Sequence, residues 1–146
     1  MRKVLVIGST GSIGRATIEI IKTHPERLKL VAICARTYSD TFIDQIQSLR
    51  PRYTIITDPE ARSRLQAEGV DVRDSGLLFD LCRSDRINTI VFAKSGIDMV
   101  EVIFEALKYK KRVCLATKEV IVSFGELLNQ ELERSHGEII PIDSEH

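Results

Sequence analysis

Residues 3–21 decide the fold, and they read KVLVIGSTGSIGRATIEII. Residues 3–7 are a continuous run rich in Val and Ile, which is typical of a strand buried on both faces. Three glycines follow at a spacing of three residues: Gly8, Gly11 and Gly14. Apolar side chains then recur at helical spacing, at Ile13, Ala16, Ile20 and Ile21. A strand, a glycine-rich turn and a helix in this order predict a dinucleotide-binding turn.

Each glycine of the turn has a separate physical reason. Gly8 permits a tight turn where the strand ends, Gly11 lets the backbone approach a pyrophosphate, and Gly14 lets the helix pack closely. The N–H groups of the first helical turn would point at the phosphate oxygens, and the helix dipole favours their charge. Thr10 and Ser12 add hydroxyl donors. The alternative is a glycine-rich turn that holds no ligand.

The rest of the chain alternates between short β-branched runs and segments of helical period. We expect strands at residues 28–35, 53–57, 89–93, 112–116 and 138–142, and helices at 39–49, 59–67, 76–82 and 118–134. A further helix, capped by Asp98, would end near Lys108, and residues 70–73 could add a short strand. Pro141 suits an edge strand. The pattern predicts an α/β fold: a doubly wound, mostly parallel, Rossmann-type sheet with helices on both faces, forming one domain over residues 1–146.

Composition excludes several classes of protein. The 146 residues are 43% apolar and 29% charged, which is globular composition. Lys and Arg number 21, as do Asp and Glu, so the formal net charge is zero and a nucleic-acid partner bound through bulk charge is not expected. No apolar run approaches the ~20 residues of a membrane span, so no membrane partner is expected. The apolar strand begins within three residues of Met1, which leaves no room for a signal peptide.

The three cysteines indicate a reducing compartment. Cys34, Cys82 and Cys114 are odd in number, widely spaced and without a CxxC pair, so neither a zinc site nor a disulfide framework is expected. Cys34 and Cys114 lie inside apolar runs, where a buried thiol is the simplest interpretation. We therefore expect a cytoplasmic protein.

The residues after the second strand favour NADP over NAD. An NAD site places an acidic residue about 20 residues beyond the glycine turn, where it binds the ribose 2′-hydroxyl. Here the strand is followed by Arg36, Thr37 and Tyr38, and an arginine beside hydroxyl groups suits a 2′-phosphate. Arg36 as a solvated loop residue is the alternative, and Tyr38 would either stack on adenine or cover the loop.

Two further groups of polar residues follow late strands, at the edge where open α/β sheets bind ligands. Asp143 and Glu145 fall on the same side of an extended segment, and two carboxylates suit Mg²⁺ or Mn²⁺ without completing a site. A solvated tail is the alternative. Lys118 and Glu119 follow the fifth long strand, where they would meet a phosphate or the nicotinamide side, or form an exposed charge pair at a helix start.

Four strings of residues, in this order, resemble one enzyme family. They are GSTGSIG at 8–14, QIQSLRPRY at 45–53, ATKE at 116–119 with GELL at 125–128, and PIDSEH at 141–146. Together they resemble the amino-terminal part of 1-deoxy-D-xylulose 5-phosphate reductoisomerases, over essentially the whole chain. The resemblance implies an NADPH-dependent enzyme of the non-mevalonate isoprenoid pathway, which also uses Mg²⁺ or Mn²⁺. It would rearrange 1-deoxy-D-xylulose 5-phosphate and reduce the resulting aldehyde to 2-C-methyl-D-erythritol 4-phosphate.

The resemblance also implies roles for individual residues. In the glycine turn, the residues implied to hold the cofactor pyrophosphate are Thr10, Gly11, Ser12 and Ile13, beside Gly8 and Gly14. The 2′-phosphate and ribose would be held by Arg36, Thr37 and Tyr38, and NADPH would also contact Thr117 and Glu119. The substrate would be bound by Lys118, Ser144 and Glu145, of which Lys118 and Glu145 are the candidate catalytic residues. The metal would be held by Asp143 and Glu145.

Members of that family are much longer than this chain. We therefore expect a cofactor-binding domain over residues 1–146, with the catalytic and carboxyl-terminal domains outside it and no turnover by this part alone. A phosphorylated sugar substrate and a homodimer of the full-length protein are expected on the same grounds. One alternative is a free-standing NADP-binding sensor or regulatory module without chemistry. Another is a different NADP-dependent dehydrogenase, such as a homoserine or semialdehyde dehydrogenase relative, although the DSEH string at 143–146 argues against it.

Overall fold

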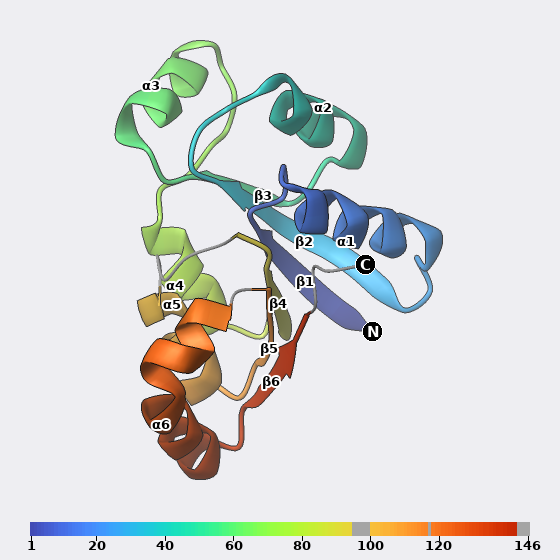
Figure 1. Cartoon of the computed structure of the whole chain (residues 1–146). Coiled ribbons are helices and arrows are strands. Elements are labelled where there is room, and N and C mark those ends of the chain that lie inside the picture. Colours follow the sequence, from blue (N-terminus) through green and yellow to red (C-terminus); the bar gives the residue numbers. More distant parts are fainter. Residues whose placement is uncertain (95–99, 117, 143–146) are drawn as a thin grey trace.

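The strands form a single parallel sheet in the order β3-β2-β1-β4-β5-β6 (Figure 1). The computed structural model describes residues 1–94, 100–116 and 118–142, and for residues 118–123 it describes the backbone only. The strands are β1 (Arg2–Ile7), β2 (Leu28–Ala35), β3 (Tyr53–Ile56), β4 (Thr89–Phe92), β5 (Arg112–Leu115) and β6 (Glu138–Pro141). Every pairing between neighbours is parallel. The predicted fold class is confirmed, and β6 is an edge strand as Pro141 suggested.

Helices cover both faces of this sheet (Figure 1). They are α1 (Ser12–Thr23), α2 (Asp40–Leu49), α3 (Pro59–Ala67), α4 (Gly76–Cys82), α5 (Val100–Lys108) and α6 (Lys118–Ser135). Because successive side chains of a strand point to opposite faces, each strand from β1 to β5 contributes side chains to a core on both faces of the sheet. Toward the first three helices, the core contains Ile33 and Ile56 with Ile18, Phe42 and Leu65. Toward the last three, it contains Leu5 and Ile90 with Leu78, Ile103 and Leu128.

Helix starts follow the capping signals in the sequence. The Ser39 hydroxyl accepts a hydrogen bond from the Phe42 amide (3.2 Å), so α2 begins one residue after Ser39. The Asp58 carboxylate accepts from the Ala61 amide (3.0 Å), and Pro59 is the first residue of α3. A side-chain oxygen at these positions satisfies an amide that the helix itself leaves open.

Residues 70–73 do not form the short strand that their composition suggested. Only one bridge links this segment to the sheet, between Arg73 and Ile55. The Val72 amide donates to the Val70 carbonyl (3.1 Å). This bond turns the chain, so the segment does not present successive amide and carbonyl groups for pairing with a neighbouring strand. Val72 is buried all the same, with 1% of its surface exposed. Hydrophobic burial therefore holds this segment in place without strand pairing.

The last helix is bent, whereas the sequence suggested one continuous helix. Phe124 has non-helical backbone angles (φ −125°, ψ 16°) inside α6. Gly125, a poor helix former, follows directly. The ring of Phe124 meets that of Phe104 in α5 edge to face, with 6.5 Å between the ring centres. The bend thus coincides with a packing contact between the two helices.

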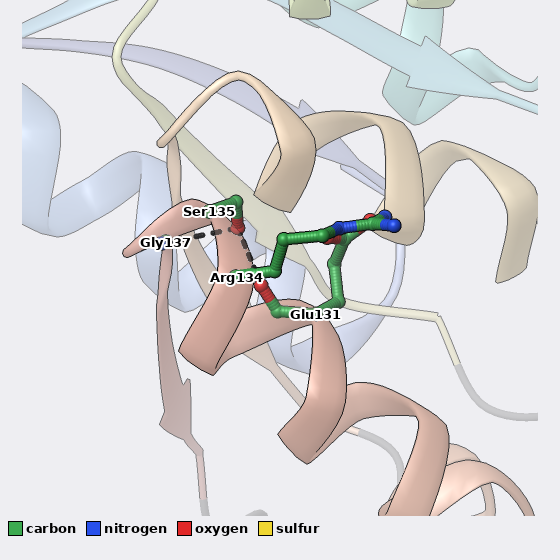
Figure 2. A network of polar contacts seen from close by, with 4 residues as sticks. All are labelled: Glu131, Arg134, Ser135 and Gly137. Atoms are coloured by element: carbon green, nitrogen blue, oxygen red, sulfur yellow. Dashed lines mark hydrogen bonds and ion pairs between the residues drawn. The ribbon is translucent and has the colours of Figure 1, made fainter.

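A local network of hydrogen bonds ends α6 and directs the chain into β6 (Figure 2). The Ser135 hydroxyl donates to the Glu131 carbonyl (2.6 Å), and the Gly137 amide donates to the Ser135 hydroxyl (3.4 Å). Arg134 donates to both carboxylate oxygens of Glu131 through its Nη2. A Cβ atom on Gly137 would lie 2.8 Å from the Leu107 carbonyl oxygen, so the turn packs tightly against α5.

Candidate nucleotide-binding site

A cavity of about 500 Å³ opens where the central strands of the sheet end. Its walls come from the ends of β1 and β2, from the residues that follow each of the strands β1 to β5, and from the start of α1. The lining residues are Ile7, Gly8, Thr10, Gly11, Ser12, Ile13, Cys34, Ala35, Arg36, Thr57, Ala93, Lys94 and Ala116. Because the chain runs from β1 to β2 on one side and returns to β4 on the other, the cavity lies where the strand order reverses. Open α/β sheets bind their ligands at such points.

The three glycines of the turn have different surroundings. Gly8 has a φ of +84°, and a Cβ there would lie 2.9 Å from the Lys94 amide nitrogen. A Cβ on Gly14 would lie only 2.1 Å from the Gly8 carbonyl oxygen, so this glycine lies packed under the turn and does not line the cavity. A Cβ on Gly11 would meet nothing nearer than the Gly8 oxygen at 3.9 Å. The space above Gly11 is therefore open to a ligand.

Helix α1 begins at this open glycine. Gly11 is its N-cap residue, and it has no side chain to accept a hydrogen bond from the amides of the first turn. The first turn also contains no acidic residue. Its N–H groups and the positive end of the helix dipole therefore suit an anion, while Thr10 and Ser12 line the same cavity.

The three residues predicted to hold the 2′-phosphate and ribose lie in different surroundings. Arg36 is exposed and lines the cavity, and it also lines a second cavity of about 540 Å³. The two cavities share Arg36, Thr57 and Lys94. Tyr38 lines neither cavity and packs against the core under α2 and α3, with the Arg64 guanidinium 5.3 Å from its ring centre. Thr37 is exposed and also lines neither.

Lys94 is a site residue that sequence reasoning missed. It follows β4, lines both cavities, and its backbone packs against Gly8. Burial raises the pKa of the neighbouring Cys34 thiol to about 12, while the Lys94 charge acts in the opposite direction. Cys34 thus contributes an uncharged, unreactive wall. An available signal was the position of Lys94, one residue beyond the predicted strand at 89–93, at the ligand edge.

The remaining predicted site residues cannot be placed around the cavity. Lys118 and Glu119 are the first residues of α6, and only their backbone is described. Thr117, Asp143, Ser144 and Glu145 lie outside the described residues. Among the side chains that the structure describes, in residues 1–94, 100–116 and 124–142, no three of His, Cys, Asp or Glu gather as metal ligands would. No helix in the described part of the chain is long and apolar enough to span a membrane.

Comparisons with known proteins agree on one family. The family model described as 1-deoxy-D-xylulose 5-phosphate reductoisomerase matches residues 4–125. A protein of that name from Moorella thermoacetica is 36% identical over 99% of this chain and 39% of its own length. One from Chlamydia caviae is 34% identical over 100% of this chain and 40% of its own. The chain thus spans about two fifths of the length of these curated relatives.

Solved structures agree with this match. A reductoisomerase of the same name from Zymomonas mobilis, in complex with NADPH, superposes with a TM-score of 0.84 and 26% identity over 99% of this chain and 39% of its own. Another reductoisomerase, in complex with NADPH, fosmidomycin and magnesium, superposes with a TM-score of 0.84 and 25% identity over 99% of this chain and 37% of its own. A homoserine dehydrogenase from S. aureus superposes with a TM-score of 0.63 and 18% identity over 97% of this chain and 32% of its own. At that identity the two proteins share the fold alone.

Proposed function

Because the chain belongs to the 1-deoxy-D-xylulose 5-phosphate reductoisomerase family, we propose that it is the NADPH-binding part of a longer enzyme of isoprenoid biosynthesis. That enzyme would convert 1-deoxy-D-xylulose 5-phosphate into 2-C-methyl-D-erythritol 4-phosphate. The observation that carries the proposal is the cavity at the reversal of strand order, with the open backbone of Gly11 on one side and Arg36 on the other.

The described residues fit a dinucleotide phosphate. The pyrophosphate would lie over Gly11, held by the amides at the start of α1 and by the hydroxyl groups of Thr10 and Ser12. Arg36 would pair with the 2′-phosphate, because a guanidinium donates several parallel hydrogen bonds to phosphate oxygens. Thr37 and Tyr38 remain predicted members of this segment. Bound NADPH supplies the hydride of the reaction, and the protein's part here is to bind and orient it.

The remaining site assignments rest on the family resemblance. Thr117 and Glu119 would contact NADPH, while Lys118, Ser144 and Glu145 would bind the phosphorylated sugar, with Lys118 and Glu145 as catalytic residues. The carboxylates of Asp143 and Glu145 would hold Mg²⁺ or Mn²⁺, whose role would be to polarise the substrate carbonyl. They supply only two ligands, so the third would come from a part of the enzyme beyond residue 146.

Three parts of the proposal concern the protein as a whole. Residues 1–146 would form one cofactor domain, and the catalytic and carboxyl-terminal domains would lie outside it. The longer enzyme would act as a homodimer in the cytoplasm, without nucleic acid or membrane. The three free cysteines support a reducing compartment. Gel filtration of the longer enzyme tests the dimer, and fractionation of the cells that make it tests the location.

A calorimetric titration of this chain with NADPH, and separately with NADH, tests the proposed function. We expect NADPH to bind more tightly, since the 2′-phosphate adds a charge-assisted contact. Equal binding of both would contradict the proposed recognition of the 2′-phosphate and with it the preference for NADPH. Failure of both to bind would overturn the assignment of residues 1–146 as a self-sufficient cofactor domain.

A further inference from the structure

One side chain outside the cavity is bonded twice to the glycine turn. Gln45 of α2 donates from Nε2 to the Ser9 carbonyl (2.8 Å), and the Ser9 hydroxyl donates to Gln45 Oε1 (2.8 Å). Both residues are buried, with 7% and 0% of their surfaces exposed. Ser9 lies between Gly8 and Thr10, which line the cavity, but it does not line the cavity itself. The pair thus joins α2 to the turn without occupying the ligand space.

This pair restricts a segment that would otherwise be free to move. A turn with glycines at two nearby positions has many accessible backbone conformations, and fixing one of them costs entropy. The Ser9 amide donates to the Cys34 carbonyl (3.4 Å), and the Gly8 amide donates to the same oxygen (2.8 Å). With Gln45 added, the amide, carbonyl and hydroxyl of Ser9 are all bonded within the protein. Ser9 is therefore a fixed point of the turn.

Helix α2 is a rigid support for this contact. Ser39 caps its start, and Phe42 in its first turn is 0% exposed in the core. The same helix begins directly after the loop that contains Arg36. The glycine turn and the loop that contains Arg36 are thus both attached to α2.

We propose that Gln45 is a positioning residue, which holds Ser9 so that the Gly11 backbone and the start of α1 are ready to receive the cofactor pyrophosphate. The inference rests on the proposed NADPH function. Glutamine suits the task because its amide supplies a donor and an acceptor at one end, as Ser9 requires. A methionine of similar length removes both bonds and leaves the Ser9 carbonyl and hydroxyl without their partner.

The test compares Q45M with Q47M, a matched control on the same helix, since Gln47 is exposed. Each variant is first checked for cooperative unfolding and is then titrated with NADPH and NADH. We expect Q45M to bind NADPH about tenfold more weakly, with the ratio of NADPH to NADH affinity unchanged, and Q47M to match the wild type. In NMR spectra without ligand, the amide signals of Gly11 and Ser12 should shift in Q45M and stay in place in Q47M.

The variant S9A keeps the inference testable if Q45M does not fold. It removes only the hydroxyl bond, so we expect about threefold weaker NADPH binding. The double variant S9A/Q45M should bind about as weakly as Q45M alone, because both changes act on one contact. If a folded Q45M or S9A variant binds NADPH as tightly as the wild type, the positioning role of Gln45 is overturned and the proposed function is unaffected. A wild-type chain that binds neither nucleotide overturns the assignment of residues 1–146 as a self-sufficient cofactor domain, and this inference with it.

Discussion

Gly11 and Gly14 lie three residues apart, yet the structure gives them opposite reasons to be glycine. A side chain on Gly14 would overlap the backbone of the turn, whereas one on Gly11 would enter open space in the cavity. Gly11 also has an ordinary backbone conformation (φ −76°, ψ 176°) that other residues adopt. Under the proposed function, Gly11 is therefore required by the ligand, whereas Gly14 is required by the fold.

We expect Gly11→Val to remain folded and lose NADPH binding by more than about tenfold, because its side chain fills the pyrophosphate position. Its free energy of unfolding should change by less than about 1 kcal/mol. Gly14→Ala should lower that free energy by about 3 kcal/mol, because its Cβ would overlap the Gly8 oxygen. Chemical denaturation and calorimetry measure the two effects separately. Unchanged nucleotide affinity in Gly11→Val would contradict the pyrophosphate position.

Arg36 is the residue from which we expect discrimination between the two nucleotides. Arg36→Ala should weaken NADPH binding by about tenfold and leave NADH binding nearly unchanged, because only NADPH has the 2′-phosphate. Arg27→Ala is a suitable control, since Arg27 is exposed just before β2 and lines neither of the two cavities that contain Arg36. Equal losses for both nucleotides would show that Arg36 does not recognise the 2′-phosphate.

At the scale of the elements, the attachment of the edge strand β6 depends partly on one ion pair. Arg112 of β5 donates from Nε and Nη2 to the two carboxylate oxygens of Glu138, at 2.6 and 3.3 Å. These residues face each other in the strand register. The Arg112 hydrogen bond holds the pKa of Glu138 below its usual range, with burial acting in the other direction. The pair lies on the surface, so its effect on stability is small.

The lowered pKa of Glu138 predicts the direction in which the stability of the fold changes with pH. A carboxyl with a lower pKa in the folded state stabilises the fold at pH above its unfolded pKa, and this stabilisation is lost as the pH falls through the folded value. An NMR titration should therefore give Glu138 a lower midpoint in the wild type than in Arg112→Gln. Arg134→Gln, which breaks a separate pair with Glu131, should leave the Glu138 midpoint in place. Identical midpoints in the wild type and Arg112→Gln would contradict the pairing.

Elements were predictable from the sequence where local chemistry determines them. The helix starts at residues 39 and 59 were predicted to within a residue, because a capping side chain acts on its own neighbours. The bend at Phe124 and the turn at Val72 were not predictable in this way. Both coincide with packing against elements distant in the sequence, and the local pattern of apolar residues does not predict such contacts. Gln45 was missed for the same reason, since its contacts with the turn join residues that are far apart along the chain.

At the scale of the whole molecule, the alternation of strands and helices predicted a parallel sheet but not its strand order. That order depends on β4 returning to pair with β1, from Val4 opposite Thr89 to Ile7 opposite Phe92. The pairing creates the reversal at which the cavity opens. The amino-terminal half of the candidate site was predictable because the glycine turn and Arg36 carry local signals. The contribution of β4 was not, because it arises only from the pairing.

The buried core predicts how the three thiols react in the intact molecule. Cys34 and Cys82 are 1% and 0% exposed, and burial raises the pKa of each to about 12. Cys114 is half-buried. With a thiol-specific reagent at neutral pH, we expect Cys114 to react first and the other two only as the molecule unfolds. In denaturant all three should react at once, and Cys114→Ser should remove the early phase. Rapid labelling of two thiols in the native protein would contradict this arrangement of the core.

The central position of β1 has a consequence for the order of events during synthesis. This strand is made first of the six described, and its partner β2 follows soon afterwards. Its other partner, β4, is complete only once Phe92 has been added. Until then, one edge of a strongly apolar strand has no neighbour and can pair with another growing chain. We therefore expect the docking of β4 against β1 to be the step at which folding competes with aggregation.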